Sequence, residues 1–222
     1  MERLICIAIG YLFGVIQTGY FYGKIKHTDI REHGSGNAGS TNALRTFGVK
    51  AGVIVLLGDT LKVIIATLIV RFIYTASHPD DIGMLVIYTG FGAVLGHNFP
   101  FYLKFKGGKG IAATAGMVIA TLSWQTILIA AIIFVLVFLI TRYVSAGSLV
   151  VVLAVFTLYT VFGMLGKLPG YGEGAWNSIL EASGILFLNA ILAYIRHAKN
   201  IGRLLNGTEK ALKFTRKGEY NG

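Results

Sequence analysis

Twelve consecutive residues, GSGNAGSTNALR from Gly34 to Arg45, form a small polar segment between two strongly apolar stretches. Glycine lets backbone N–H groups approach a ligand closely, because no Cβ intervenes. Ser40 or Thr41 is placed to cap a short helix starting near Asn42, and free N–H groups at a helix start bind anions. Arg45 lies one turn into that helix, where its guanidinium can hold a phosphate through two parallel hydrogen bonds. The segment predicts an anion cradle suited to phosphate; the alternative is a flexible turn.

A second segment, GHNFPFYLKFKGGKG at 96–110, combines lysines with glycines and ends where the next apolar run begins. Glycine next to a cationic helix start is again typical of phosphate binding. His97 comes at the end of the preceding apolar run. The alternative is that the lysines only contact anionic lipid and fix the topology, and that His97 is structural.

A third segment, IRHAKNIGRLLNGTEKALKF, places Arg196, Lys199 and Arg203 at near-helical spacing, with Asn200 among them. It predicts a further polar wall of the site or, alternatively, a basic amphipathic tail on anionic lipid. None of the three segments has the spacing of a P-loop.

Two charged residues, Asp59 and Lys62, lie inside an apolar run at i and i+3, so they share one face of a helix and can pair. Ionisable residues within membrane segments mark functional positions by default. The alternative is a buried ion pair that holds helices in register. The spacing leaves both interpretations open.

Several kinds of chemistry are not indicated by the sequence. It contains no G-x-S-x-G nucleophile motif, no histidine followed by an aspartate five residues later, and no D-x-x-D cluster. The one cysteine, Cys6, can form neither an internal disulfide nor a cysteine-based metal site. We therefore predict chemistry without a metal ion and without a cofactor.

The elements that position these segments are apolar. Of 222 residues, 55% are hydrophobic and only 14% are charged, well below the charged fraction of soluble domains. The runs are close to the roughly 20 residues that a membrane-spanning helix needs. We predict an all-α polytopic membrane protein, a single domain over 1–222, with seven transmembrane helices near 4–22, 51–74, 82–96, 110–122, 125–140, 148–165 and 179–195. The stretch 111–140 is either one long helix or two helices broken near Ser123.

The charge distribution indicates the orientation. Most of the 20 Lys and Arg residues fall in the links 23–50, 97–109 and 141–147 and in the tail from Arg196. With seven spans these segments share one side, which the positive-inside rule makes cytoplasmic. We predict the N-terminus outside and the C-terminus in the cytoplasm. The net charge of +10 is then topological and does not indicate a nucleic-acid partner.

Together, GSGNAGSTNALR, GHNFPFYLKFKGGKGIAA and RHAKNIGRLLNGTE resemble the three cytoplasmic motifs of the bacterial acyl-phosphate:glycerol-3-phosphate acyltransferase family. The motif segments lie near 34–45, 96–110 and 196–209, and chain length and motif order agree. Ala38 and Ser40 stand where the family often has proline and alanine. The resemblance implies transfer of a fatty acyl group from acyl phosphate to the 1-hydroxyl of glycerol 3-phosphate, giving lysophosphatidic acid and phosphate, at the cytoplasmic face of the bacterial inner membrane. Besides these two substrates we expect membrane lipids as partners, and no obligatory protein partner.

On this basis we assign His97, Arg45 and Lys104 to catalysis, with His97 as the candidate acceptor of the hydroxyl proton; the alternative acceptor is a substrate phosphate. The amides of the glycines at 107, 108 and 110 are expected to reach a phosphate or the developing oxyanion. The substrate- and phosphate-binding assignments are Ser35, Gly36, Asn37, Gly39, Ser40, Thr41, Gly107, Gly108, Lys109, Gly110, Asn200 and Arg203.

Two other classes of function share the cationic loops. A membrane transporter of an anionic, phosphate-containing solute would more naturally place its charges near the bilayer midplane, often on two related halves, and the sequence shows no such repeat. A non-catalytic scaffold would use the loops to bind lipid headgroups. Turnover of acyl phosphate and glycerol 3-phosphate separates the enzyme from both.

Overall fold

The computed structural model describes residues 1–212, so Lys213, Arg216 and Lys217 of the basic tail lie outside the described residues. Every regular element in the described chain is helical, as the sequence predicts. The α-helices are α1 (Glu2–Gly14), α2 (Thr18–Ile25), α3 (Ser40–Phe47), α4 (Val49–Tyr74), α5 (Ile82–Asn98), α6 (Ile111–Thr121), α7 (Trp124–Thr141), α8 (Val144–Met164), α9 (Trp176–Arg196) and α10 (Ala198–Leu205). Two 3₁₀ turns, Ile30–Glu32 and Phe101–Leu103, lie in the connections.

Within the described residues, six helical segments are long and apolar enough to cross a membrane. They are Glu2–Ile25, Val49–Tyr74, Ile82–Leu103, Trp124–Thr141, Val144–Met164 and Trp176–Arg196. The remaining apolar helix, α6, has 11 residues, which rise about 16 Å, roughly half of the hydrocarbon core. A membrane protein of apolar helices is confirmed, and the count of seven crossings stays a prediction. The stretch 111–140 is two helices, because α6 ends before Ser123 and α7 begins after it.

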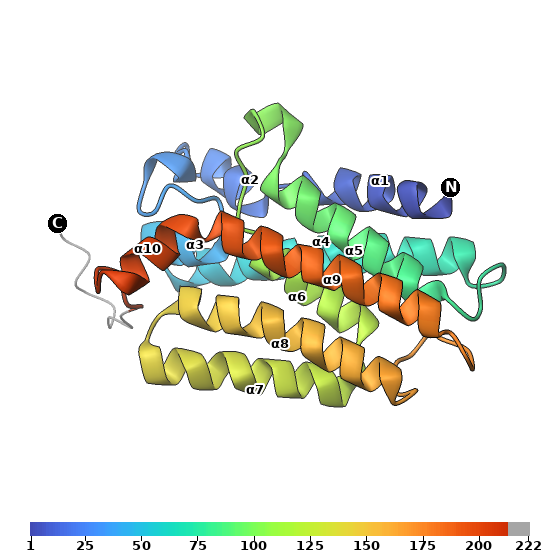
Figure 1. Cartoon of the computed structure of the whole chain (residues 1–222). Coiled ribbons are helices and arrows are strands. Elements are labelled where there is room, and N and C mark those ends of the chain that lie inside the picture. The colour runs from blue at the N-terminus through green and yellow to red at the C-terminus, as the bar shows by residue number, and fades with distance from the viewer. Residues whose placement is uncertain (213–222) are drawn as a thin grey trace.

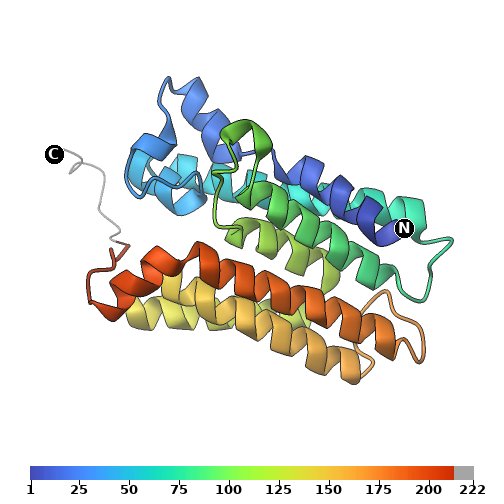
Figure 2. The ribbon, with the colours of Figure 1, turned by 45° about the horizontal axis from the view of Figure 1, so that its top comes forward.

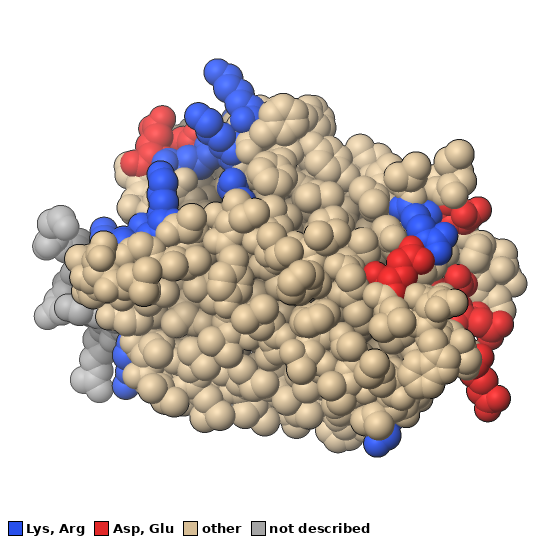
Figure 3. Space-filling view, viewed as in Figure 1, with Lys and Arg blue, Asp and Glu red and all other residues tan. Residues whose placement is uncertain are grey.

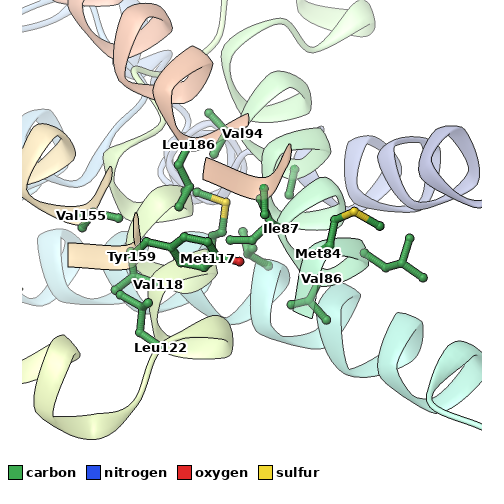
Figure 4. Close-up of a cluster of buried hydrophobic side chains, with 14 of the residues drawn as sticks. Met84, Val86, Ile87, Val94, Met117, Val118, Leu122, Val155, Tyr159 and Leu186 are labelled. Atoms are coloured by element: carbon green, nitrogen blue, oxygen red, sulfur yellow. The ribbon is translucent and has the colours of Figure 1, made fainter. Parts of the chain in front are cut away.

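The long helices run roughly parallel or antiparallel to one another (Figures 1 and 2). They form two groups, the α7–α8 hairpin and the remaining helices. α5 is the central helix: it packs against α1, α4, α6 and α9, and most of its residues are buried. α7 and α8 form a hairpin that joins the rest mainly through the contact of α8 with α9. Figure 4 shows the core where these groups meet, with Met84 and Ile87 of α5, Met117 of α6, Tyr159 of α8 and Leu186 of α9 close together.

The polar segments gather at one end of this bundle. α3, α10 and the link between α2 and α3 lie at the end opposite the N-terminus (Figure 1). In Figure 3 apolar and uncharged residues cover the long side of the molecule, while charged side chains stand at its two ends and Lys and Arg predominate at the end that carries α10. The fold therefore brings the three predicted motif segments to the same end.

The contact between α1 and α5 depends on glycine. Gly10 and Gly14 of α1 lie against the backbone of Thr89 and Ala93 in α5. Gly92 and Gly96 of α5 lie against the backbone of Ile7 and Tyr11 in α1, so each helix carries a G-x-x-x-G pattern on the shared face. A Cβ added to Gly10 would lie 1.9 Å from the carbonyl oxygen of Thr89. Small residues at this spacing let two membrane helices approach until their backbones touch.

We predict that Gly10→Ala destabilises the protein by about 1–3 kcal/mol, because the added methyl meets backbone that cannot turn away. Gly184→Ala is the matched control: it lies in α9, and its Cβ would meet open space. Thermal unfolding in detergent should give a lower melting temperature for the first variant and not for the second. Equal melting temperatures would contradict the close contact of α1 and α5.

Candidate active site

A cavity of about 530 Å³ lies where α3 and α10 meet the ends of the longer helices. Its polar lining comes from all three motif segments and from α4, α6 and α8: Ser35, Asn37, Gly39, Ser40, Thr41, Asn42, Arg45, Asp59, His97, Lys109, Thr114, Ser145, Ser148, His197, Asn200, Arg203 and Glu209. Its apolar lining comes from α4, α6, α7 and α8 and includes Leu56, Ile111, Val118, Ile119, Ile127, Ala130, Phe134, Val135, Val151, Val152 and Val155. The cavity is therefore polar at one part and apolar at the other.

The first motif is folded around Asn42. Its Oδ1 accepts from the Ser35 N–H at 2.8 Å, and its Nδ2 donates to the carbonyl oxygens of Ile30 and His33, both at 3.0 Å. These bonds tie the glycine-rich loop to the 3₁₀ turn before it. Gly36 adopts φ +71° in this loop, a conformation that side chains other than glycine rarely adopt; it shapes the turn and is not part of the cavity wall.

The helix that follows this loop begins earlier than the sequence predicts. α3 starts at Ser40, its N-cap is Gly39, and no side chain caps it, so the expectation of a Ser40 or Thr41 cap is wrong. Ser40 and Thr41 are instead in the first turn and line the cavity. Arg45 also lines it, and its Nη2 donates to the Lys210 carbonyl oxygen at 3.0 Å. A guanidinium has five donors, so this bond leaves others for a ligand.

The second motif is arranged differently from the prediction. The N–H groups of Gly107 and Gly108 donate to the carbonyl oxygens of Asn98 and His97, at 3.1 and 3.0 Å. These amides are occupied within the protein, so the expectation that they face a phosphate is not met in this structure. The two glycines are needed for close packing: a Cβ on Gly108 would lie 2.0 Å from His97 Nε2.

The lysines of the second motif separate into two groups. Lys104 and Lys106 are exposed, on a turn that projects from the bundle (Figure 1), and Lys104 is not part of the cavity wall. Lys109 is half-buried, lines the cavity and donates through Nζ to Asn200 Oδ1. Gly110, at φ +84°, then leads into α6. Of the residues assigned to catalysis, Arg45 and His97 reach the cavity and Lys104 does not.

The third motif is organised by a carboxylate that the sequence analysis did not single out. Glu209 Oε1 accepts from Ser145 Oγ at 2.8 Å and from Asn200 Nδ2 at 2.7 Å, and its Oε2 accepts from Arg203 Nε at 2.6 Å. Burial alone would raise the pKa of Glu209, but these hydrogen bonds hold it below its ordinary value. Glu209 therefore stays ionised and fixes Asn200 and Arg203 relative to α8.

Arg196, which the sequence places in the third motif without a specific role, joins the third motif to the second. Its Nη2 donates to the carbonyl oxygens of Gly107 and Gly108 at 3.0 and 2.9 Å, and its guanidinium lies 5.3 Å from the ring centre of Phe99. The basic spacing of the tail indicated contact with anions. The structure instead uses this arginine to hold the glycine pair.

A second missed residue, His197, is buried and lines the cavity. Its Nδ1 lies 2.8 Å from the Ala193 carbonyl oxygen. A carbonyl can only accept, so Nδ1 carries the proton and Nε2 presents a lone pair. Burial lowers the pKa of His197 to about 4, so the ring is neutral at physiological pH.

Asp59 and Lys62 form the ion pair that their spacing allows, with Nζ 2.9 Å from Oδ1, and both side chains are buried. Both residues belong to α4, and their side chains reach the break between α1 and α2. Lys62 Nζ donates to the carbonyl oxygens of Gly14 and Ile16, and Asp59 Oδ1 accepts from Thr18 Oγ1 at 3.0 Å. The pair therefore holds three helices in register, and it also reaches the cavity, since Asp59 lines it.

No group of three or more His, Cys, Asp or Glu residues that could hold a metal ion occurs in residues 1–212. The cationic side chains that line the cavity, Arg45, Lys109 and Arg203, are available to bind an anion. Metal-free chemistry stays a prediction.

The fold and the cavity define an integral membrane protein with a binding site that combines cationic groups with apolar walls. The family model described as glycerol-3-phosphate acyltransferase matches residues 4–207. The chain belongs to the glycerol-3-phosphate acyltransferase family and is an acyltransferase enzyme.

Named relatives and solved structures agree with this membership. The glycerol-3-phosphate acyltransferase of Thermotoga petrophila is 40% identical over 204 residues, covering 91% of this chain and 92% of its own. That of Bacillus subtilis is 37% identical, covering 94% and 96%. The crystal structure of PlsY (YgiH), an integral membrane glycerol 3-phosphate acyltransferase in its glycerol 3-phosphate form, matches with a TM-score of 0.78 at 31% identity over 96% of each chain. Its lysophosphatidic acid form gives a TM-score of 0.76.

We predict that anion binding weakens as the pH rises through about 8. Burial lowers the pKa of the Lys109 ammonium to about 8; Arg203, Arg45 and Arg196 act in the same direction, and Glu209 acts against them. Lys109 is charged below this pH and loses its charge above it. Calorimetric titration with inorganic phosphate from about pH 7 to pH 9.5 should show a rising Kd.

Lys109→Arg is the control, because a guanidinium stays charged throughout this range. Its Kd should stay nearly constant over the same pH interval. If the variant and the wild type lost affinity in parallel, the loss would come from another group.

Proposed function

We propose that this protein transfers a fatty acyl group from acyl phosphate to the 1-hydroxyl of glycerol 3-phosphate, giving lysophosphatidic acid and phosphate, the first step of phospholipid synthesis. One observation carries the proposal: a single cavity joins cationic side chains from three motifs to an apolar wall built by α6, α7 and α8. One substrate is water-soluble and phosphorylated, and the other has a phosphate at the head of a fatty chain. Such a cavity suits both.

In this proposal the cationic groups neutralise phosphate. Arg45 and Lys109 contact phosphate oxygens, and Asn200 and Arg203 close the polar end. Hydrogen bonds from the first loop come from Ser35, Asn37, Gly39, Ser40 and Thr41. Lys104, which is exposed, raises the local concentration of anionic substrates outside the cavity.

The chemical step needs no covalent enzyme intermediate. The hydroxyl oxygen of glycerol 3-phosphate attacks the acyl carbonyl carbon, the bond from that carbon to the phosphate oxygen breaks, and its electron pair leaves with phosphate. The hydroxyl proton passes to an acceptor in the cavity, for which His97, His197 and a phosphate oxygen of the substrates are the candidates. A mixed anhydride has a good leaving group, so a serine or cysteine nucleophile is unnecessary.

The membrane arrangement belongs to the same proposal. The chain crosses the bacterial inner membrane seven times, with α6 as a short fourth element, the N-terminus outside and the active site at the cytoplasmic face. Support comes from the excess of Lys and Arg at the end that carries α3 and α10 (Figure 3). The chain acts as one domain without an obligatory protein partner.

The direct test uses purified protein in detergent with acyl phosphate and glycerol 3-phosphate. Formation of lysophosphatidic acid and phosphate in equal amounts is the expected result. Uptake of glycerol 3-phosphate into protein-containing vesicles without turnover would instead support a transporter.

Arg45→Lys should lower kcat/KM about tenfold to a hundredfold, because hydrogen bonds to charged groups are worth roughly 1.5–3 kcal/mol and lysine lacks the planar fork of a guanidinium. Arg142→Lys is the control, since Arg142 is exposed in the link between α7 and α8. Its kcat/KM should match the wild type. Wild-type activity in Arg45→Lys would show that Arg45 does not bind phosphate.

Single cysteines in a Cys6→Ala background test the topology. Lys106→Cys and Lys199→Cys should react with an impermeant thiol reagent only from the cytoplasmic side, and Ser77→Cys only from the outside, because these positions are exposed at opposite ends. Labelling of Lys106→Cys and Lys199→Cys from different sides would overturn the seven-crossing arrangement.

A further inference from the structure

Lys62 is surrounded by four polar atoms deep inside the bundle. Its Nζ lies 3.1 Å from the Gly14 carbonyl oxygen, 2.6 Å from that of Ile16, 2.9 Å from Asp59 Oδ1 and 3.0 Å from His97 Nδ1. The side chain of Lys62 is only 5% exposed. Two carbonyls and one carboxylate form a site for a cation, so the amine is held as an ammonium.

This environment fixes the position of the proton on His97. An ammonium has donors and no acceptor, so His97 Nδ1 must present its lone pair to Lys62. In a neutral imidazole the other nitrogen then carries the proton. Protonation of Nδ1 would direct an N–H group at the ammonium 3.0 Å away. The ring is therefore the neutral tautomer with its proton on Nε2.

The Nε2 side of the ring faces the second motif. A Cβ on Gly108 would lie 2.0 Å from Nε2, and His97 lines the cavity. Among the described residues, the polar contacts of the His97 side chain are made through Nδ1. Its backbone carbonyl accepts from Gln17 Nε2 and from the Gly108 N–H. An N–H donor at Nε2 is thus left to serve an oxygen of a bound substrate.

We infer that Asp59 and Lys62 are positioning residues that hold His97 as a hydrogen-bond donor, so that His97 does not accept the hydroxyl proton. The inference rests on the proposed acyl transfer. Asp59 orients Lys62 within the same helix, and Lys62 sets the tautomer. His97 then donates through Nε2 to an anionic oxygen of the reacting groups, and the proton goes to another acceptor in the cavity.

The tautomer can be measured without any turnover. Protein carrying ¹⁵N-labelled histidine in detergent micelles gives separate imidazole signals for protonated and unprotonated nitrogen, and loss of a signal pair in His97→Gln assigns it. The expected result is an unprotonated Nδ1 and a protonated Nε2 for His97 near neutral pH. A proton on Nδ1, or on both nitrogens, would overturn the inference.

Lys62→Met tests the cause. Without the ammonium, the nearest charged group to Nδ1 is Asp59 Oδ1, at 3.7 Å, so the ring proton should move to Nδ1 and kcat should fall. Lys50→Met is the matched control, because Lys50 is exposed on the same helix; its tautomer and kcat should stay those of the wild type. A folded Lys62→Met protein with its proton still on Nε2 would refute the role of Lys62. If the variant does not fold, the wild-type spectrum decides.

Substitutions of His97 separate a donor from a base. His97→Gln keeps an N–H donor near the position of Nε2 and should retain kcat within about tenfold, whereas loss of a general base costs about 10²–10⁴-fold. His97→Glu offers only an acceptor and should be much less active. If His97→Glu were more active than His97→Gln, His97 would be the base.

Wild-type protein with the expected tautomer but without lysophosphatidic acid formation would refute the proposed function and leave the tautomer supported.

Discussion

The ion pair of Asp59 and Lys62 is the interaction on which the site depends. A helix that breaks within apolar surroundings leaves backbone groups without partners, and each such group costs several kcal/mol in lipid. The ammonium of Lys62 satisfies the carbonyls at the end of α1, and Asp59 binds Thr18 at the start of α2. The break lets α2 leave the direction of α1, which carries the chain toward the loop before α3. The same pair also contacts His97. One buried ion pair therefore affects both the course of the chain into the first motif and the tautomer of His97 in the second motif.

The remaining connections join the second motif to the third, and Arg45 of the first motif to Lys210 just beyond the third. Arg196 holds the glycine pair, Lys109 reaches Asn200, and Glu209 ties α10 to Ser145 of α8. Each bond joins segments that are far apart in the sequence. The polar end of the cavity is therefore held together by hydrogen bonds between segments that are distant in the chain.

The helices and the grouping of the three motif segments could be predicted from the sequence. Apolar runs and the excess of basic residues predicted the helices and placed the three polar segments together, because both depend on the composition of continuous stretches. The cap of α3 and the role of the Gly107 and Gly108 amides could not be predicted, since they depend on which carbonyls lie nearby in space. Glu209 was missed because its partner Ser145 is distant in the chain. The G-x-x-x-G spacing in α1 and α5, in contrast, can be read directly from the sequence and indicates a close helix contact.

The apolar part of the cavity is walled by helices that other parts of the protein cover little. Ile119 of α6 and Val135 of α7 line the cavity and are themselves 46% and 47% exposed, and α7 is the least covered of the long helices in the described chain, at 11% buried. Both helices therefore present apolar side chains to the outside of the bundle, where a membrane protein meets lipid. Moving a fatty tail into water costs about 0.8 kcal/mol for each CH₂. In the proposed reaction, a fatty-chain substrate that reached the cavity from the lipid side would avoid that cost, whereas glycerol 3-phosphate and phosphate are soluble in water.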